Sequence, residues 1–167
     1  MTSLQRAFVA IALMVFANAS FGAEPPDQVS STAALDAMLA NYGEAAAKFY
    51  DGKPDAVKEL WSHADDVTLS GAAGGETAKG WSNVSKRLEW ASSQFSKGSK
   101  EVQLIQRTVS GDFAYVVQYE HILFFPPGGS TQSKRDYRVT TIFRREPAGW
   151  RVVHRHADTQ MTVQAIR

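Results

Sequence analysis

The sequence predicts one α+β domain in which helices come first and a long antiparallel sheet follows. Between residues 33 and 50 the large apolar residues recur in steps of three and four, which marks one face of a helix. From residue 101 onward apolar and polar residues alternate, as they do in strands with one buried face. Short turn sequences separate these later segments, so neighbouring strands should pair antiparallel.

The composition fits a globular domain. A chain of 167 residues suits one domain, with 44% hydrophobic and 21% charged residues. Cysteine is absent, which excludes disulfides, thiolate chemistry and zinc sites with sulfur ligands. The formal net charge is +1, and the basic residues form no stripe that would suit nucleic acid. We therefore expect neither a nucleic-acid partner nor charge-driven membrane binding.

Residues 1–23 have the organisation of a signal peptide. Arg6 supplies the positive start, and the apolar run Ala7–Ala17 is too short to span a bilayer. Small residues then fit cleavage after Ala19 or after Gly22. A retained N-terminal anchor is the alternative, whereas a lipoprotein is excluded because no cysteine can carry the lipid. The mature chain is expected in the periplasm or outside the cell.

The mature chain should begin with a linker and continue as one folded unit. Residues 24–32 are polar and include two prolines, so they are predicted to be the linker. Residues 33–164 are predicted to be the domain. Ser31 or Thr32 can cap the first helix through a side-chain oxygen.

The elements follow one another along the chain. A helix over residues 33–50 has an apolar face made of Leu35, Met38, Leu39, Tyr42, Ala46 and Phe49. A short helix over 54–62 begins at Pro54, and a third helix is expected over 81–95. Residues 71–80 hold four glycines without the lysine-serine ending of a phosphate-binding loop, so they should form a rim or lid. Strands are expected over residues 67–69, 101–109, 113–125, 135–145 and 150–161.

Three segments of the chain carry a family resemblance: DGKPDAVKELWSHADDVTLSG, KGWSNVSKRLEW and TTIFRREPAGWRVVHRHAD. In this order and spacing, over residues 35–161, the chain resembles the nuclear transport factor 2-like superfamily and its SnoaL-like branch. The resemblance implies a cone-shaped fold, in which a curved antiparallel or mixed sheet wraps around N-terminal helices. It also implies a deep pocket and a homodimer built on the sheet. The superfamily includes ketosteroid isomerase, scytalone dehydratase, polyketide cyclases and pockets without chemistry, so the fold alone does not identify an activity.

The last predicted strand carries candidate acid–base residues. His154 and His156 alternate onto one face of this strand together with Asp158. In one interpretation either histidine lines the pocket and acts as a general acid or base. In another, His154 packs in the sheet and hydrogen-bonds a neighbour. These side chains could also hold a metal, but the resemblance implies none, and no metal or other cofactor is expected.

Asp66 is the candidate general base before the first strand. A carboxylate in an apolar pocket gains basicity by desolvation, and ketosteroid isomerase has a base near this part of its chain. The alternative is that Asp65 and Asp66 form a solvated turn or a cap. That enzyme also uses a tyrosine and a protonated acid. Tyr42 could supply the phenol, but no aspartate stands inside an apolar run where the acid is expected.

Five side chains are candidates for ligand binding. Arg138 lies inside a predicted strand, where it could clamp a carboxylate with its guanidinium fork or form a surface salt bridge. Trp61 and Trp81 should lie in the core or in the pocket wall, with partners for their N–H groups. Tyr42 and Tyr119 are candidates to hold a substrate.

Three functions stay open at this point. The preferred interpretation is an exported domain that binds a small organic molecule in a hydrophobic pocket. The first alternative is an enzyme of the isomerase, dehydratase or cyclase type, with Asp66, His154 or His156 as its base. The second alternative is a non-catalytic, dimeric interaction module in which the pocket has no role.

Overall fold

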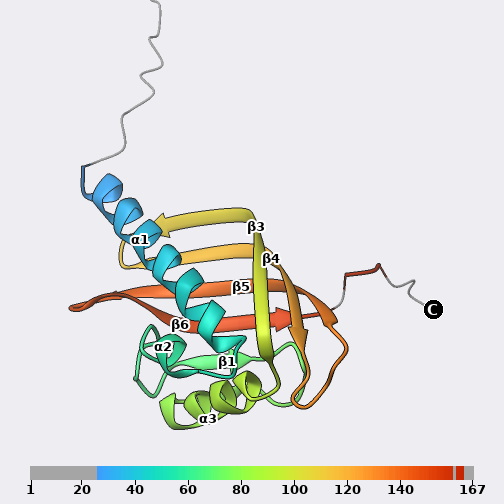
Figure 1. Ribbon diagram of the computed structural model, residues 1–167. Helices are drawn as coiled ribbons and strands as arrows, with labels where there is room; N and C mark the ends of the chain where they lie inside the picture. The colour runs from blue at the N-terminus through green and yellow to red at the C-terminus, as the bar shows by residue number, and fades with distance from the viewer. Residues whose placement is uncertain (1–25, 160, 164–167) are drawn as a thin grey trace, which may run out of the picture.

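The computed structural model describes residues 26–159 and 161–163, so the predicted signal peptide lies outside the described residues. The described chain contains helices and one sheet, as the predicted α+β class requires (Figure 1). The helices are α1 (Pro26–Phe49), α2 (Asp55–Lys58) and α3 (Trp81–Ser92). The strands are β1 (Thr68–Ser70), β2 (Ala78–Lys79), β3 (Ser96–Ser110), β4 (Phe113–Phe125), β5 (Ser133–Glu146) and β6 (Gly149–Asp158).

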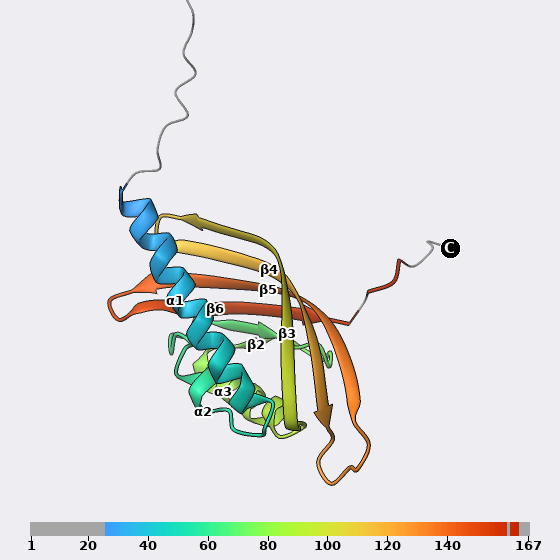
Figure 2. The ribbon, with the colours of Figure 1, turned by 45° about the horizontal axis from the view of Figure 1, so that its top comes forward.

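The sheet is mixed and strongly curved. Its strands lie in the order β2-β1-β6-β5-β4-β3, and the four long strands β3–β6 are antiparallel neighbours. In contrast, β1 pairs parallel with β6, with Thr68 opposite His154. Figure 2 shows β3, β4 and β5 bending along their length and α1 lying across the concave side. This arrangement confirms the predicted cone-shaped sheet wrapped around N-terminal helices.

The main core lies between α1 and the concave face of the sheet. Leu35 and Met38 on α1 are buried, and Trp61, which follows α2, is 1% exposed. Each large apolar side chain that is fully buried stabilises the fold by roughly 1.5–3 kcal/mol. The sheet residues of the same cluster are Leu69, Ala114, Val116, Phe143, Trp150, Val152 and Val153.

A β-bulge in β6 reverses which side chains face the concave side. Ile142 pairs with His154, but the next residue, Phe143, pairs with Val152, so Val153 is the extra residue. Before the bulge, Trp150 and Val152 are buried against the helices. After it, the odd-numbered residues take the concave side. The predicted uninterrupted alternation from Trp150 to Asp158 is therefore wrong.

Several boundaries differ from the prediction. Helix α1 begins at Pro26, so residues 26–32 of the predicted linker are helical, and proline is well suited to a first helical turn. Helix α2 ends at Lys58, because residues 60–62 instead bond to the sheet through the backbone of Val152. The predicted glycine loop contains the two-residue strand β2. No helix among the described residues has the length and apolar character needed to cross a membrane.

Candidate functional site

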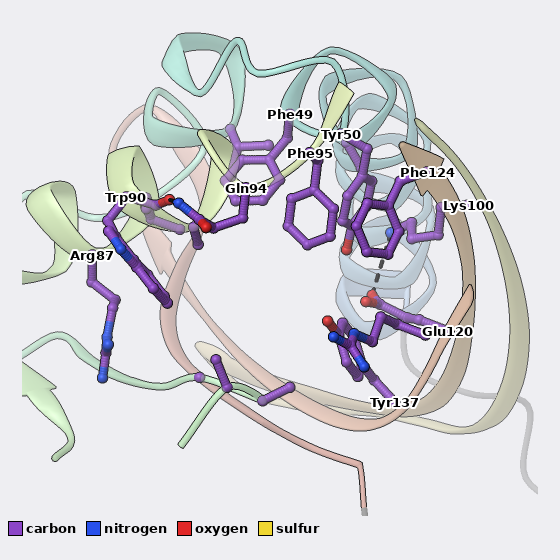
Figure 3. A pocket seen from close by; sticks show the side chains of 18 of the residues that line it. Phe49, Tyr50, Arg87, Trp90, Gln94, Phe95, Lys100, Glu120, Phe124 and Tyr137 are labelled. Atoms are coloured by element: carbon purple, nitrogen blue, oxygen red, sulfur yellow. Dashed lines mark hydrogen bonds and ion pairs between the residues drawn. The ribbon is translucent and has the colours of Figure 1, made fainter. Parts of the chain in front are cut away.

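A cavity of about 380 Å³ lies between the C-terminal half of α1, helix α3 and the concave face of the sheet. Small-molecule sites typically have about 300–1,000 Å³, so an organic molecule of modest size fits. Part of the glycine-rich loop, residues 71–74, and the loop at Pro126 and Pro127 contribute to its lining. Figure 3 shows the side chains that point into it.

Aromatic rings form one side of the cavity. Tyr50 and Phe95 meet edge-to-face with their ring centroids 4.9 Å apart, and Phe95 meets Phe124 in the same way at 4.8 Å. The rings of Phe49 and Tyr50 also meet edge-to-face, with their centroids 5.4 Å apart. Such edge-to-face pairs contribute about 0.5–1.5 kcal/mol each beyond the area they bury. The rings therefore hold one another in place and present a firm apolar surface.

Three charged side chains, Lys100, Glu120 and Arg155, meet beside these rings, and we call them the charged trio. Arg155 Nη2 donates to Glu120 Oε2 at 2.6 Å, and Lys100 Nζ donates to Glu120 Oε1 at 3.3 Å. Gln118 Nε2 also donates to Oε1, at 2.7 Å. Only 1% of the Glu120 side chain, 7% of Lys100 and 13% of Arg155 is exposed. The trio is a buried ionic cluster in the cavity lining.

The register of the sheet brings the trio together. On β4 the even-numbered residues face the concave side, which buries Glu120 and places Tyr137 of β5 opposite it. Lys100 on β3 lies opposite Ile122 of β4, which is also buried. Arg155 follows the bulge in β6 and therefore shares this face. The cavity thus combines side chains from five strands of the sheet, β1 and β3 to β6.

Glu120 and Arg155 are ionised at neutral pH. Burial acts to raise the pKa of Glu120, but Arg155, Lys100 and the Gln118 hydrogen bond outweigh it and lower that pKa to about 2. Burial lowers the pKa of Lys100, against the attraction of Glu120. Burial opposes the charge on Arg155 as well, but Glu120 outweighs it and raises the pKa of the guanidinium. Glu120 is therefore an anion that accepts hydrogen bonds. Its low pKa makes it a weak base.

Two phenols in the cavity stay protonated. Burial raises the pKa of Tyr42 and, more strongly, that of Tyr50. The Lys100 ammonium lies 5.5 Å from the centre of the Tyr42 ring, within range of a cation–π interaction. These phenols can donate hydrogen bonds to a ligand without changing their charge.

Of the candidate ligand-binding residues, Tyr42 lies in the cavity lining. Trp61 lies in the main core, and Trp81 packs against that core. The Trp81 ring is stacked on the His63 ring, with the ring centroids 3.9 Å apart. The Trp61 Nε1 makes no hydrogen bond within the described residues, although the indole is close enough to Tyr42 to lower the pKa of that phenol. Both tryptophans therefore belong to the main core, and neither lines the cavity.

Tyr119 and Arg138 lie on the convex face of the sheet, which we call the outer face. They are opposite one another in the β4–β5 register. Arg138 is half exposed and forms an ion pair of 3.0 Å with Asp158 of β6. The predicted position of Arg138 in the pocket is therefore corrected. Alternation on β5 points Arg135 and Tyr137 into the cavity and Arg138 away from it.

The candidate catalytic residues also lie outside the cavity lining. Asp66 is 63% exposed and forms an ion pair of 2.6 Å with Arg144. That hydrogen bond, the largest influence, lowers the pKa of Asp66, so its basicity is reduced. His154 Nδ1 lies 2.8 Å from Thr68 Oγ1 and links β6 to β1, which is the packing interpretation of this residue. His156 is exposed, and the bulge at Val153 places both histidines on the outer face.

No group of three histidine, cysteine, aspartate or glutamate side chains among the described residues is arranged to hold a metal ion. The residues that sequence reasoning missed are the charged trio. Glu120 carries a usable signal, since it shares a strand face with Val116 and Ile122, both apolar. Arg155 carries none, because the bulge that turns it inward has no recognisable residue pattern in WRVVHRHAD.

Solved structures with the same fold come from several bacteria. A candidate dehydratase of the nuclear transport factor 2-like family from Streptomyces avermitilis has a TM-score of 0.67 at 20% identity, covering 81% of this chain and 99% of that one. A nuclear transport factor 2-like superfamily protein from Salmonella enterica has a TM-score of 0.68 at 18% identity, covering 81% of this chain and 96% of that one. A ketosteroid isomerase-like protein from Erwinia carotovora atroseptica scores 0.59 at 15% identity, covering 82% and 98%.

Because all three sequence identities are low, these likenesses establish the fold alone. The chain matches no curated protein. Residues 35–160 match the model of the SnoaL-like domain, and this stretch is most of the chain. It overlaps the segments DGKPDAVKELWSHADDVTLSG and TTIFRREPAGWRVVHRHAD, on which the resemblance was based. The protein belongs to the SnoaL-like domain family, and it shares its fold with solved structures of the nuclear transport factor 2-like superfamily.

Proposed function

We propose that this protein is exported and binds a small, largely apolar organic molecule in the cavity of the cone. One observation carries the proposal. The cavity of about 380 Å³ joins a firm aromatic surface, at Tyr50 and Phe95, to buried polar groups of the charged trio. Binding sites for small molecules have this character, with apolar lining and a few convergent polar groups.

Blocking the cavity tests the proposal. Ala91 lies on α3 and lines the cavity, so Ala91→Trp should fill much of the space. Lys86 is exposed on the same helix and does not line the cavity, so Lys86→Trp is the matched control. The measurement is isothermal titration calorimetry with 2-naphthol. Binding to the wild type and to Lys86→Trp but not to Ala91→Trp is expected, and equal binding by both variants would refute a site in the cavity.

An acid–base reaction receives less support than binding. The candidate bases Asp66, His154 and His156 lie outside the cavity lining. The carboxylate inside it, Glu120, is paired with two cations, and its pKa is lowered to about 2. A general base works best with a pKa near the working pH. The names of two structural neighbours, a candidate dehydratase and a ketosteroid isomerase-like protein, are the support that exists for this alternative.

Export is proposed from residues 1–23 and concerns where the ligand is met. The positive start, the apolar run and the small residues that follow are the features that signal peptides share. Mass spectrometry of protein recovered from the periplasm or the medium tests this directly. A mature N-terminus at Ser20 or Ala23 is expected. An intact Met1 on all of the protein would contradict export by a cleaved signal.

A homodimer on the outer face is proposed as the assembly. That face exposes apolar side chains of β4: Phe113 is 52% exposed, Tyr115 40% and Leu123 41%. Exposed apolar patches of this kind often mark interaction sites. Sedimentation velocity should therefore give a dimer for the wild type and a monomer for Tyr115→Glu. A monomeric wild type at micromolar concentration would contradict the assembly.

A further inference from the structure

The cavity concentrates positive charge. Four of its lining residues are basic and one is acidic, which gives a formal charge of 4 − 1 = +3 among Arg87, Lys100, Arg135, Arg155 and Glu120. The whole chain, by comparison, has a formal net charge of only +1. Charges act more strongly on one another in a partly enclosed site than in bulk water, because the surrounding protein is less polarisable. An uncharged ligand would leave this excess uncompensated.

Part of the excess is buried in the charged trio. Glu120 supplies one negative charge, while Lys100 and Arg155 supply two positive charges, and all three side chains are at most 13% exposed. Glu120 is the sole acidic side chain among the described residues that line the cavity. Within the described residues, Arg155 uses one nitrogen of its guanidinium for Glu120, and a guanidinium has five N–H donors. The inner end of the cavity therefore offers one unmatched positive charge and free donors.

Apolar rings lie directly beside this charge. Figure 3 shows Tyr50, Phe95 and Phe124 next to Lys100 and Glu120. Trp90 lies further along the cavity, where Arg87 stands 5.4 Å from its ring centre. A ligand that satisfies both parts of the site needs an apolar body and one compact anionic group. A phosphate dianion would place two charges where the trio offers one.

We propose that the ligand is an organic monoanion, an aromatic or alicyclic carboxylate. Its carboxylate lies against Arg155 and Lys100, and its ring lies against Tyr50 and Phe95. Arg135, which is exposed at the cavity rim, adds attraction as the anion enters. This inference rests on the proposed function, since it names the class of molecule that the same cavity binds.

Matched acids and amides of equal shape test the inference. The probes are 2-naphthoate and 2-naphthamide, together with benzoate and benzamide, titrated into the wild type by isothermal titration calorimetry. Hydrogen bonds to charged groups contribute about 1.5–3 kcal/mol, so each acid should bind about 10–100-fold more tightly than its amide. The preference should weaken as salt is added, because part of the attraction acts through solvent at the rim.

Two arginines on one strand supply a matched pair of variants. Arg135 and Arg138 both lie on β5, but Arg135 lines the cavity and Arg138 lies on the outer face. Arg135→Gln should weaken naphthoate severalfold and leave naphthamide unchanged, whereas Arg138→Gln should change neither. Lys100→Met should remove most of the preference for the acid. A circular dichroism melt identifies a variant that has failed to fold, and Arg135→Gln then carries the test.

The outcomes separate the two proposals. Acids and amides that bind equally well would overturn the anion while leaving a small-molecule site intact. Equal losses from Arg135→Gln and Arg138→Gln would also overturn it, because the effect would then be general to the net charge. If none of the four probes and no 2-naphthol binds, the site itself is refuted and the anion with it.

Discussion

Arg155 of β6 donates a hydrogen bond of 2.6 Å to Glu120 of β4, although β5 lies between these two strands. The pair therefore reaches across a neighbouring strand on the concave face, with both side chains largely buried. An ion pair in this setting contributes little net stability over an apolar replacement, but losing one partner leaves a buried charge unmatched. A substitution of Glu120 or Arg155 should consequently change both the charge of the cavity lining and the stability of the sheet.

Removing the anion of this pair should destabilise the protein. Glu120→Gln keeps the shape of the side chain but leaves Lys100 and Arg155 without a counter-charge. The free energy of unfolding should fall by about 3–5 kcal/mol at pH 7, as for other broken buried ion pairs. Urea denaturation followed by circular dichroism measures the change. The control is Asp66→Asn, which breaks a largely exposed ion pair. This substitution should lower the free energy of unfolding by no more than about 1 kcal/mol.

The same pair predicts an acid-dependent loss of stability. The pKa of Glu120 is about 2 in the folded protein, below its ordinary value of 4.5. A lowered pKa means that the ionised form stabilises the fold above about pH 4.5 and that this contribution is lost as the pH falls towards 2. The contribution is about 3 kcal/mol, from 1.36 kcal/mol per pKa unit. The difference in unfolding free energy between wild type and Glu120→Gln should therefore shrink between pH 5 and pH 2.5, and a constant difference would contradict the assignment.

Gly98 should be intolerant of a side chain. A Cβ at this position would lie 2.5 Å from the Tyr50 carbonyl oxygen and 2.6 Å from Tyr50 Cβ, which is closer than real contacts allow. Gly98→Ala should therefore lower the free energy of unfolding by about 1–3 kcal/mol through overpacking, and should disturb the aromatic side of the cavity. Its amide also donates to the Tyr50 carbonyl at 2.9 Å.

Gly43 is the natural comparison for Gly98. It lies within α1, and a Cβ there would meet nothing within 4 Å. Gly43→Ala should raise the free energy of unfolding by up to about 1 kcal/mol, because alanine favours the helix. Thermal melts of the two variants should move in opposite directions. If both fell equally, the close approach of Gly98 to Tyr50 would not be the cause.

The residues predicted from sequence to be catalytic should be dispensable for binding. Asp66 pairs with Arg144, and His154 with Thr68, both away from the cavity lining. Asp66→Asn and His154→Ala should therefore bind 2-naphthoate with an affinity within about twofold of wild type. Substitutions far from the cavity that share no partner with the ligand act independently of binding. Calorimetric titration measures this. A tenfold loss in either variant would mean that these side chains reach the ligand.

The elements were predictable from sequence because the residues that form them repeat regularly. The spacing from Leu35 to Phe49 marks the face of α1, and the alternation from Phe113 to Phe125 marks β4 with its bounds. Short turns made the antiparallel order of the last strands predictable. These features depend on neighbours in the chain, which a single sequence displays.

The site was predictable only in part because it depends on register. Tyr42 follows from the helical face, and it does line the cavity. The sequence does not say which face of β5 is concave, so it predicts neither that Arg138 lies on the outer face nor that Arg135 lines the cavity. A regular strand would place His154 and His156 on the same face as Trp150 and Val152, but one extra residue at Val153 turns both histidines outward. The partners of Glu120 come from strands that only the folded sheet brings together.

The most direct test is to locate a bound molecule by nuclear magnetic resonance. Intermolecular nuclear Overhauser effects between 2-naphthoate and assigned aromatic rings report which face of the sheet the ligand contacts. We predict that 2-naphthoate lies in the cavity, with contacts to Tyr50 and Phe95 and with shifts of the Arg155 side-chain signals. Contacts confined to Tyr115 and Tyr119 on the outer face, with no change at Arg155, would contradict this prediction.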